Sequence, residues 1–197
     1  MIKWKTISKE IALKTDHLTI VKSDVEMPNG EISHYYYTDS PGNVIIIPVK
    51  LDSELSEHKY IMVRQYRYPV GSYDLEFPAG RRESGESILD AAARELKEET
   101  GYTATETKLL YTMYSNPAGN NSTTSICLAT VVGEGKDTEL DQHEEQAELR
   151  VEEIGADELH KKILSMDISD AHTMAAIAAF IMNSKLATQY LGSQSED

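Results

Sequence analysis

The pattern of hydrophobic and polar positions predicts a β-rich start to the chain. Residues 18–26 and 32–38 are mostly extended in character, and Asn29-Gly30 between them favours a hairpin turn. After a turn at residues 40–43, residues 44–49 form a continuous β-branched run suited to a buried strand, and residues 60–65 are expected to pair with it. We therefore expect a small antiparallel sheet, followed by the beginning of a central sheet.

The strongest helical signal covers residues 86–100, which contain no proline or glycine and are rich in Ala, Leu, Glu and Lys. Gly101 follows as a left-handed C-terminal cap. The other expected elements are strands at residues 108–114 and 125–132, a polar loop at 133–148, a short strand at 149–151, and helices at 157–164 and 170–191. A helix between sheet strands, with further helices at the end, predicts an α/β/α sandwich with a mixed central sheet.

Composition narrows the possible partners. The net charge is −14, which argues against a phosphate-backbone binder, because such proteins use clustered Lys and Arg. Cys127 is the single cysteine, and its apolar surroundings favour a small core residue. No apolar run has the length of a membrane span, and the start of the chain lacks a secretory signal. We expect a cytoplasmic protein with no nucleic-acid or membrane partner.

Three glutamates share one face of the helix expected at residues 86–100. Successive helical residues advance by about 100°, so Glu95, Glu98 and Glu99 project within about a third of the circumference. This face adjoins the apolar stripe that is expected to point into the core, formed by Ile88, Leu89, Ala92 and Leu96. The three acids are therefore expected at the edge of a buried surface.

An ordinary solvated helix would pair these acids with bases one turn away. Glu98 lies four residues after Arg94, but Glu95 lies four residues before Glu99, and like charges at that spacing repel. A hard divalent cation with oxygen ligands would remove the repulsion, and an acidic protein can bind a phosphorylated molecule through such ions. Helix chemistry alone leaves both a metal site and a charged surface open.

The spacing around the helix is more specific. Residues 80–102 read GRRESGESILDAAARELKEETGY, in which Gly80, Glu86, Arg94, Glu95, Glu98, Glu99 and Gly101 match the pattern G-x5-E-x7-R-E-U-x-E-E-x-G-U, with U a bulky apolar residue. This segment resembles the Nudix box of Nudix hydrolases. The one departure is Tyr102, which replaces an aliphatic residue and is expected to affect packing more than chemistry.

The resemblance implies roles for the matching residues. Glu95 and Glu99 would bind Mg²⁺, or Mn²⁺ in its place, with help from Glu98 and the backbone carbonyl of Ala79. Arg94 would orient the carboxylates, and Glu86 would brace the loop; Gly80 and Gly101 would be structural. The implied reaction is hydrolysis of a P–O–P bridge, since bound cations neutralise the diphosphate and activate a water.

Sequence upstream of the box resembles the ADP-ribose pyrophosphatase branch of that family. The resemblance rests on Gln65-Tyr66-Arg67 and on the segment EFPAG at residues 76–80. Pro117 lies 16 residues after Gly101, the spacing that accompanies ADP-ribose preference in that branch. The following segment, NPAGNN at residues 116–121, departs from the branch, so GDP-mannose or a broad range of nucleotide sugars is the alternative substrate. A non-catalytic nucleotide-sugar sensor is the alternative of another class.

Other residues are candidates for substrate contact and for proton transfer. Arg64, Arg67 and Arg81 lie near the glycine loop and suit bidentate phosphate contact, although Arg64 and Arg67 could equally pair with Glu76 or a neighbouring acid. Related enzymes often place a general base in a late acidic loop. Glu145 is the first choice here, and the alternatives are Glu144, Glu148 and His143.

The resemblance also implies a division of the chain. Residues 1–43 would form an N-terminal β segment that joins two subunits into a homodimer, residues 44–192 the Nudix hydrolase domain, and residues 193–197 a flexible tail. The expected partner, apart from the second subunit, is a nucleoside diphosphate sugar.

Overall fold

The structure is a computed structural model, and it describes residues 3–51, 58–136 and 138–183. The chain divides into two compact units, one formed by Met1–Gly42 with Met113–Thr123 and the other by Asn43–Thr112 with Thr124–Asp197. We describe each unit by itself.

The first unit contains a three-stranded antiparallel sheet in the order β1-β2-β3. Its strands are β1 (Lys5–Lys14), β2 (Thr19–Glu26) and β3 (Ile32–Thr38). Gly30, with a φ of 85°, supplies the left-handed residue of the turn between β2 and β3. The expected small antiparallel sheet is confirmed, and β1 adds a strand that the polarity pattern did not single out. Only alternate β2 side chains, Val21, Ser23 and Val25, are buried.

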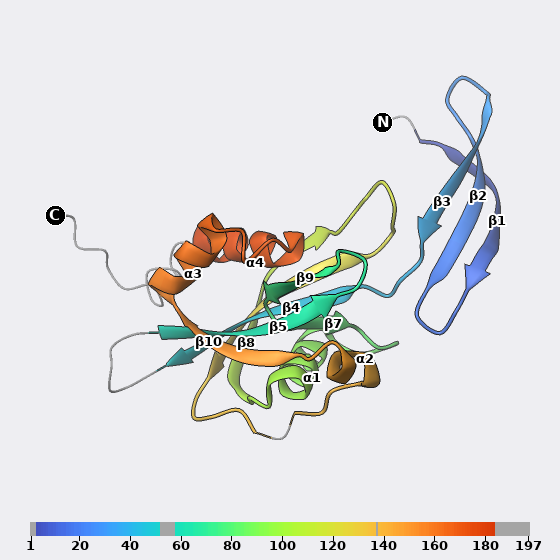
Figure 1. Cartoon of the computed structure of the whole chain (residues 1–197). Coiled ribbons are helices and arrows are strands. Elements are labelled where there is room, and N and C mark those ends of the chain that lie inside the picture. The colour runs from blue at the N-terminus through green and yellow to red at the C-terminus, as the bar shows by residue number, and fades with distance from the viewer. Residues whose placement is uncertain (1–2, 52–57, 137, 184–197) are drawn as a thin grey trace. The chain divides into compact units, whose positions relative to one another are not determined.

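The second unit is built on a mixed seven-stranded sheet (Figure 1). Its strands are β4 (Asn43–Leu51), β5 (His58–Arg67), β6 (Ser72–Glu76), β7 (Ala79–Arg81), β8 (Ala104–Tyr114), β9 (Thr123–Val131) and β10 (Arg150–Gly155). The main path runs β10-β5-β4-β9-β8, while β6 pairs with β5 and β7 pairs with β4. Because β4 is parallel to β9 and antiparallel to β5, the sheet is mixed, as predicted.

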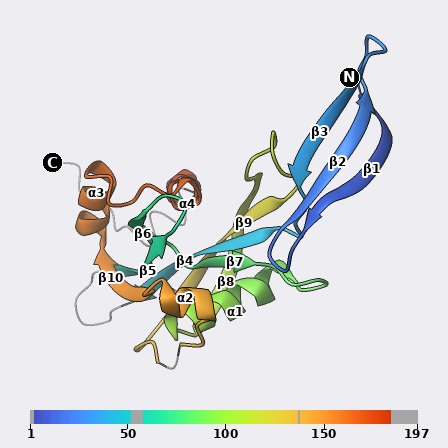
Figure 2. The same cartoon turned by 45° about the vertical axis from the view of Figure 1, so that its right-hand side comes forward.

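Helices cover both faces of this sheet, which confirms the sandwich. They are α1 (Ile88–Thr100), α2 (Gln142–Gln146), α3 (Ala156–Leu164) and α4 (Ala171–Met182). Figure 1 shows α1 and α2 on one face and α3 and α4 on the other. In the turned view of Figure 2, α2 again lies beside α1. Leu96 of α1 is fully buried in a core cluster with Val44, Ile46 and Ile61.

The opposite face of the sheet has its own aromatic core. The ring of Tyr60 on β5 makes edge contacts with Phe77 and with Phe180 of α4. The Tyr60–Phe180 contact holds the last turn of α4 over the sheet. The first turn is held by Thr173, whose Oγ1 accepts the Phe77 N–H at 3.2 Å. Cys127 on β9 is fully buried and lies in the cluster on the α1 side, as expected.

Some expected boundaries were wrong. The helix α1 begins at Ile88 because Ser87 is its N-cap and accepts a hydrogen bond from the Asp90 backbone N–H, and Gly101 ends it with a φ of 70°. Leu89, expected in the core, is 43% exposed. Inside the expected loop at residues 133–148, Asp141 and Glu144 form a capping box that begins α2.

Two expected segments extend past the described residues. The helix expected at residues 170–191 is described as α4 up to Met182, and its remainder and the tail at 193–197 lie outside the described residues. Within the part of the chain that the structure describes, no helix is both long and apolar enough to cross a membrane.

Candidate active site

Arg94 binds several of the acids on and before α1. Its guanidinium donates hydrogen bonds to both Glu86 carboxylate oxygens, at 2.9 and 3.0 Å, and to Glu95 Oε1 and Glu98 Oε2, both at 2.9 Å. It also donates to the backbone carbonyl of Arg81 at 3.1 Å. One arginine therefore ties the loop before α1 to two of the three candidate metal ligands. These hydrogen bonds raise the pKa of Arg94, so the guanidinium stays charged.

Glu95 and Glu99 are carboxylates in a buried setting, only 7% and 3% exposed. Burial raises the pKa of Glu95 to about 7, against the opposing effect of Arg94. Burial, with the nearby charges of Glu144 and Glu95, raises the pKa of Glu99 well above its ordinary value. The protein itself provides too little positive charge to keep both groups ionised.

The strand β7 lies against these two acids. The backbone N–H of Ala79 donates a hydrogen bond to Glu99 Oε2 at 3.2 Å. Next to it, Gly80 packs so closely on the Glu95 carboxylate that a Cβ at Gly80 would overlap it. The missing side chain at Gly80 is therefore what allows the carboxylate to lie beside the backbone of β7.

These observations test whether the residues fit a divalent cation. Among the described residues, no three or more His, Cys, Asp or Glu side chains stand together in a ready-made metal cluster. At this site, both Glu95 and Glu98 accept hydrogen bonds from the Arg94 guanidinium, each at 2.9 Å. Two buried, under-neutralised carboxylates next to a backbone strand nevertheless suit Mg²⁺, which takes one or two carboxylates and completes its shell with water and phosphate oxygens.

The short helix α2 brings a further carboxylate to this region. The charge of Glu144 acts on Glu95 and Glu99. Burial, with the nearby charges of Asp141 and Glu98, raises the pKa of Glu144 itself. Glu144 Oε2 also accepts the backbone N–H of Asp141 at 2.7 Å, which holds the side chain in one orientation. Glu145, the residue favoured from the sequence, is exposed on the same helix.

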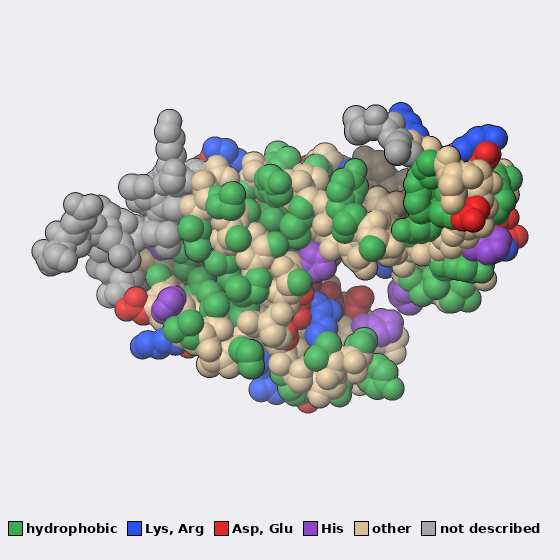
Figure 3. All heavy atoms as spheres, turned by 90° about the horizontal axis from the view of Figure 1, so that it is seen from above, with side chains coloured by type: hydrophobic (Ala, Val, Ile, Leu, Met, Phe, Trp, Pro, Cys, Tyr) green, Lys and Arg blue, Asp and Glu red, His purple; other side chains and the backbone are tan. Residues whose placement is uncertain are grey.

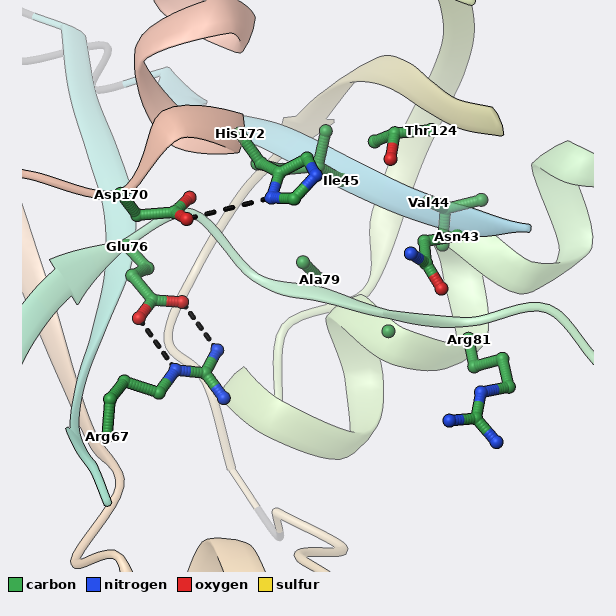
Figure 4. Close-up of a pocket in the computed structure, with 11 residues that line it drawn as sticks. Asn43, Val44, Ile45, Arg67, Glu76, Ala79, Arg81, Thr124, Asp170 and His172 are labelled. Atoms are coloured by element: carbon green, nitrogen blue, oxygen red, sulfur yellow. Dashed lines mark hydrogen bonds and ion pairs between the residues drawn. The ribbon is translucent and has the colours of Figure 1, made fainter. Parts of the chain in front are cut away.

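A cavity of about 310 Å³ opens beside β7 and the first turn of α4 (Figure 4). Its lining includes Arg67, Glu76, Arg81, Asp170 and His172. The Arg67 guanidinium donates a hydrogen bond to each carboxylate oxygen of Glu76, from Nε at 2.8 Å and from Nη2 at 2.6 Å. His172 Nδ1 and Asp170 Oδ1 form a longer ion pair at 3.6 Å.

The residues expected to bind substrate occupy different places. Arg67 and Arg81 line the cavity. Arg64 is outside the cavity lining. Its Nη1 and Nη2 each donate to an Asp167 carboxylate oxygen at 2.9 Å, and its Nε donates to Glu152. Pro117 belongs to the first unit, so its expected role stays a prediction.

Sequence reasoning missed several residues of the cavity wall. Asn43 and Thr124 begin β4 and β9, while Asp170 and His172 belong to the start of α4. These positions are far apart in the sequence and carry no motif. The one local signal was Asp170, whose side chain caps α4 by accepting the Thr173 N–H at 2.7 Å.

Comparison with known proteins agrees with this architecture. The NUDIX domain family matches residues 41–176, more than half of the chain. This protein therefore belongs to the Nudix family, as the box at residues 80–102 indicates.

Individual proteins of known name resemble this chain over most of its length. The chain is 32% identical over 188 residues to the "ADP-ribose pyrophosphatase" of Bacillus subtilis, an alignment that covers 94% of this chain and 96% of the relative. It is 31% identical over 173 residues to the "Methanol dehydrogenase activator" of Bacillus methanolicus, covering 88% and 90%. A solved structure titled "Crystal structure of ADP compounds hydrolase" superposes with a TM-score of 0.74 at 23% identity, covering 95% and 96%, which supports the fold.

Proposed function

We propose that this protein hydrolyses the P–O–P bridge of a nucleoside diphosphate sugar, with ADP-ribose giving AMP and ribose 5-phosphate as the best substrate. The observation that carries the proposal is the pair of buried, under-neutralised carboxylates of Glu95 and Glu99 beside β7. The names of the relatives favour an ADP-linked sugar.

The proposed metal is Mg²⁺, with Mn²⁺ able to replace it. Glu95 and Glu99 would hold it, with Glu98 and the Ala79 carbonyl completing the protein ligands, and Arg94 would keep the acids oriented. When bound, the cation neutralises the diphosphate and lowers the pKa of an attacking water. Glu98 would have to leave Arg94, to which it is hydrogen-bonded at 2.9 Å.

We infer that Glu144, rather than Glu145, accepts the proton of the attacking water. Burial and neighbouring acids raise the pKa of Glu144 toward the range in which a carboxylate is an effective base. Its charge also acts on both buried glutamates, whereas Glu145 is exposed. The water oxygen forms a bond to one phosphorus, the bond from that phosphorus to the bridging oxygen breaks, and the other half of the substrate leaves as a phosphate monoester.

Arg67 and Arg81 are the proposed diphosphate contacts. Arg67 is oriented by the two hydrogen bonds to Glu76, and its side chain is 46% exposed, so one edge of the guanidinium can reach an anion. Arg64 is bound by two carboxylates, so we assign it mainly to holding β5 and β10 to Asp167. Pro117 stays a proposed determinant of ADP-ribose preference.

Substitution of Glu99 tests the metal site. Glu99→Gln removes the ligand charge with little change of shape, so turnover in saturating Mg²⁺ is expected to fall by about two orders of magnitude or more while the melting temperature is retained. The matched control is Glu106→Gln, at an exposed position of β8, which is expected to leave turnover unchanged. Near-normal turnover of Glu99→Gln would refute the ligand assignment.

Two neighbouring variants test the base. Glu144→Gln retains a side chain that suits the capping box, and kcat is expected to fall about 100-fold without a change in the Mg²⁺ requirement. Glu145→Gln is expected to stay within about threefold of the wild type. The reverse order of effects would restore Glu145 as the base.

A substrate panel tests the proposed class. ADP-ribose, GDP-mannose, UDP-glucose, NADH and dinucleoside polyphosphates are incubated with the enzyme and Mg²⁺, and phosphate is measured after phosphatase treatment. The proposal expects ADP-ribose first. A preference for GDP-mannose would support the alternative sugar substrate, and binding without hydrolysis would support a sensor. A preference for nucleoside triphosphates would overturn the class.

We also propose that residues 1–43 join two subunits into a homodimer. Trp4, Ile7, Ile11 and Tyr36 in or next to the three-stranded sheet are each between 49% and 60% exposed. Figure 3 shows such hydrophobic side chains beside charged ones over this sheet. Covering them would remove apolar surface from water. Light scattering is expected to give a dimer mass, and Ile11→Lys to give a monomer; a monomeric wild type contradicts the assignment.

A further inference from the structure

The cavity beside α4 has a wall that the proposed hydrolysis chemistry does not use. Asn43 and Ile45 of β4, Thr124 of β9, and Asp170 and His172 at the start of α4 form this side (Figure 4). All of them belong to the second unit. The volume of about 310 Å³ is at the small end of the range for ligand sites, which suits one part of a nucleotide sugar rather than the whole molecule.

The first turn of α4 presents hydrogen-bonding capacity that the protein does not fully use. Asp170 Oδ2 accepts the Thr173 N–H at 2.7 Å as the helix cap. Its other oxygen, Oδ1, is 3.6 Å from His172 Nδ1, which is longer than an ordinary hydrogen bond. The carboxylate oxygen and the imidazole therefore both retain capacity for a ligand hydroxyl, and the side chains are 25% and 39% exposed.

The charges around the cavity favour an uncharged polar ligand on this side. Glu76 is paired with Arg67, and Asp170 lies 3.6 Å from His172, so each carboxylate has a basic partner within the lining. A phosphate group placed against Asp170 would meet a like charge. A hydroxylated ring, by contrast, can donate to Asp170 and also bond to the amide of Asn43 and the hydroxyl of Thr124.

The lining also argues against a nucleobase. Among the described residues that form it, none is Phe, Tyr or Trp, the side chains that usually stack on a base. A lining that is rich in polar groups and has no aromatic surface suits a sugar better than a nucleobase.

This wall adjoins the diphosphate chemistry through β7. Ala79 and Gly80 line the cavity, and the same two residues contact Glu99 and Glu95. Arg67, a proposed diphosphate contact, is part of the same lining. A ligand that extends from the diphosphate by one ring can therefore reach the start of α4.

We propose that this cavity is the sugar subsite of the enzyme, and that His172 and Asp170 bind hydroxyl groups of the sugar. The proposal rests on the proposed function, because it places the sugar of the same nucleoside diphosphate sugar. His172 and Asp170 then determine how strongly the enzyme distinguishes a sugar-bearing substrate from one without a sugar.

The test compares two substrates with the same nucleoside diphosphate. ADP-ribose carries the sugar, and the β-methyl ester of ADP carries a methyl group in its place. His172→Ala is expected to lower kcat/KM for ADP-ribose about tenfold or more and to leave that for the methyl ester within about threefold. Asp170→Asn keeps a good helix cap and is expected to show the same selective loss.

His160→Ala, at an exposed position of α3, is the matched control and is expected to leave both rates unchanged. An equal fall for both substrates, or no fall for ADP-ribose, would overturn the sugar subsite. A changed ratio between ADP-glucose and UDP-glucose in His172→Ala would also overturn it, since the cavity would then hold the base. If the wild type hydrolyses none of these compounds, the proposed function itself fails.

Discussion

Tyr102, which replaces the aliphatic residue of the box, has both a packing role and a polar role. Its ring is 4% exposed and lies in the core cluster under the sheet. Its hydroxyl donates to Glu153 Oε1 at 2.6 Å, and Lys50 Nζ donates to the same oxygen at 2.7 Å. Tyr102→Phe keeps the ring and removes only the hydroxyl, so the variant measures the polar contribution alone.

The expected loss follows from these contacts. A hydrogen bond to a charged group contributes about 1.5–3 kcal/mol. Glu153 would still be paired with Lys50, and its side chain is 30% exposed, so we reduce the expected loss to about 1–2 kcal/mol. In a chain of this size, that loss lowers the melting temperature by about 2–8 °C.

The measurement is guanidinium unfolding followed by circular dichroism, with a thermal scan beside it. Tyr111→Phe, at a position 58% exposed, is the control and is expected to change stability by less than about 0.5 kcal/mol. A double-mutant cycle with Glu153→Gln should give a coupling energy of about 1 kcal/mol. Unchanged stability of Tyr102→Phe, or a coupling energy of zero, would refute the polar role.

Three further predictions follow from the geometry. Gly80→Ala places a Cβ against the Glu95 carboxylate and is expected to lower activity about 10- to 100-fold at limiting Mg²⁺, with unfolding free energy changed by less than about 1 kcal/mol; full activity would contradict the close packing. Leu96→Ala empties a fully buried position and should cost about 2–5 kcal/mol in denaturant unfolding, against a small effect for the 41%-exposed Leu109→Ala. Hydrogen bonds from Arg64 lower the pKa of Asp167 from 3.8 to about 2, so the pair stabilises the fold above pH 4 and this contribution is lost as the pH falls through 2. Since the side chain is 35% exposed, we expect Asp167→Asn to cost about 1 kcal/mol at pH 7 and the difference from the wild type to vanish near pH 2; a pH-independent difference would contradict this account.

The helix and its acids could be predicted because their signals are local. Ser87, Gly101 and the absence of helix breakers between them define α1 within a few residues, and helical periodicity placed Glu95 and Glu99 at the edge of the core. Leu89 was wrongly predicted to be buried, because periodicity gives the direction of a side chain around the helix but not the width of the helix face that the core covers. The helix α2 was missed because its five residues carry no apolar periodicity, and only the capping box of Asp141 and Glu144 marks it.

The choice of Glu144 as the proposed base depended on the tertiary structure. Glu144, Glu145 and Glu148 are equivalent by composition, and choosing among them requires the direction of each side chain. Packing of α2 beside α1 brings the charge of Glu144, rather than Glu145, to the buried glutamates.

The sequence by itself determined the box, the acids proposed as metal ligands and the family, because spacing along one helix converts directly into shared direction. Only the tertiary structure decided the cavity wall and the partners of the arginines. Asn43, Thr124 and His172 come from three elements, joined by the β4–β9 pairing and by the packing of Phe180 on Tyr60. Such contacts depend on how distant elements pack, and the spacing of residues along the chain does not predict that packing.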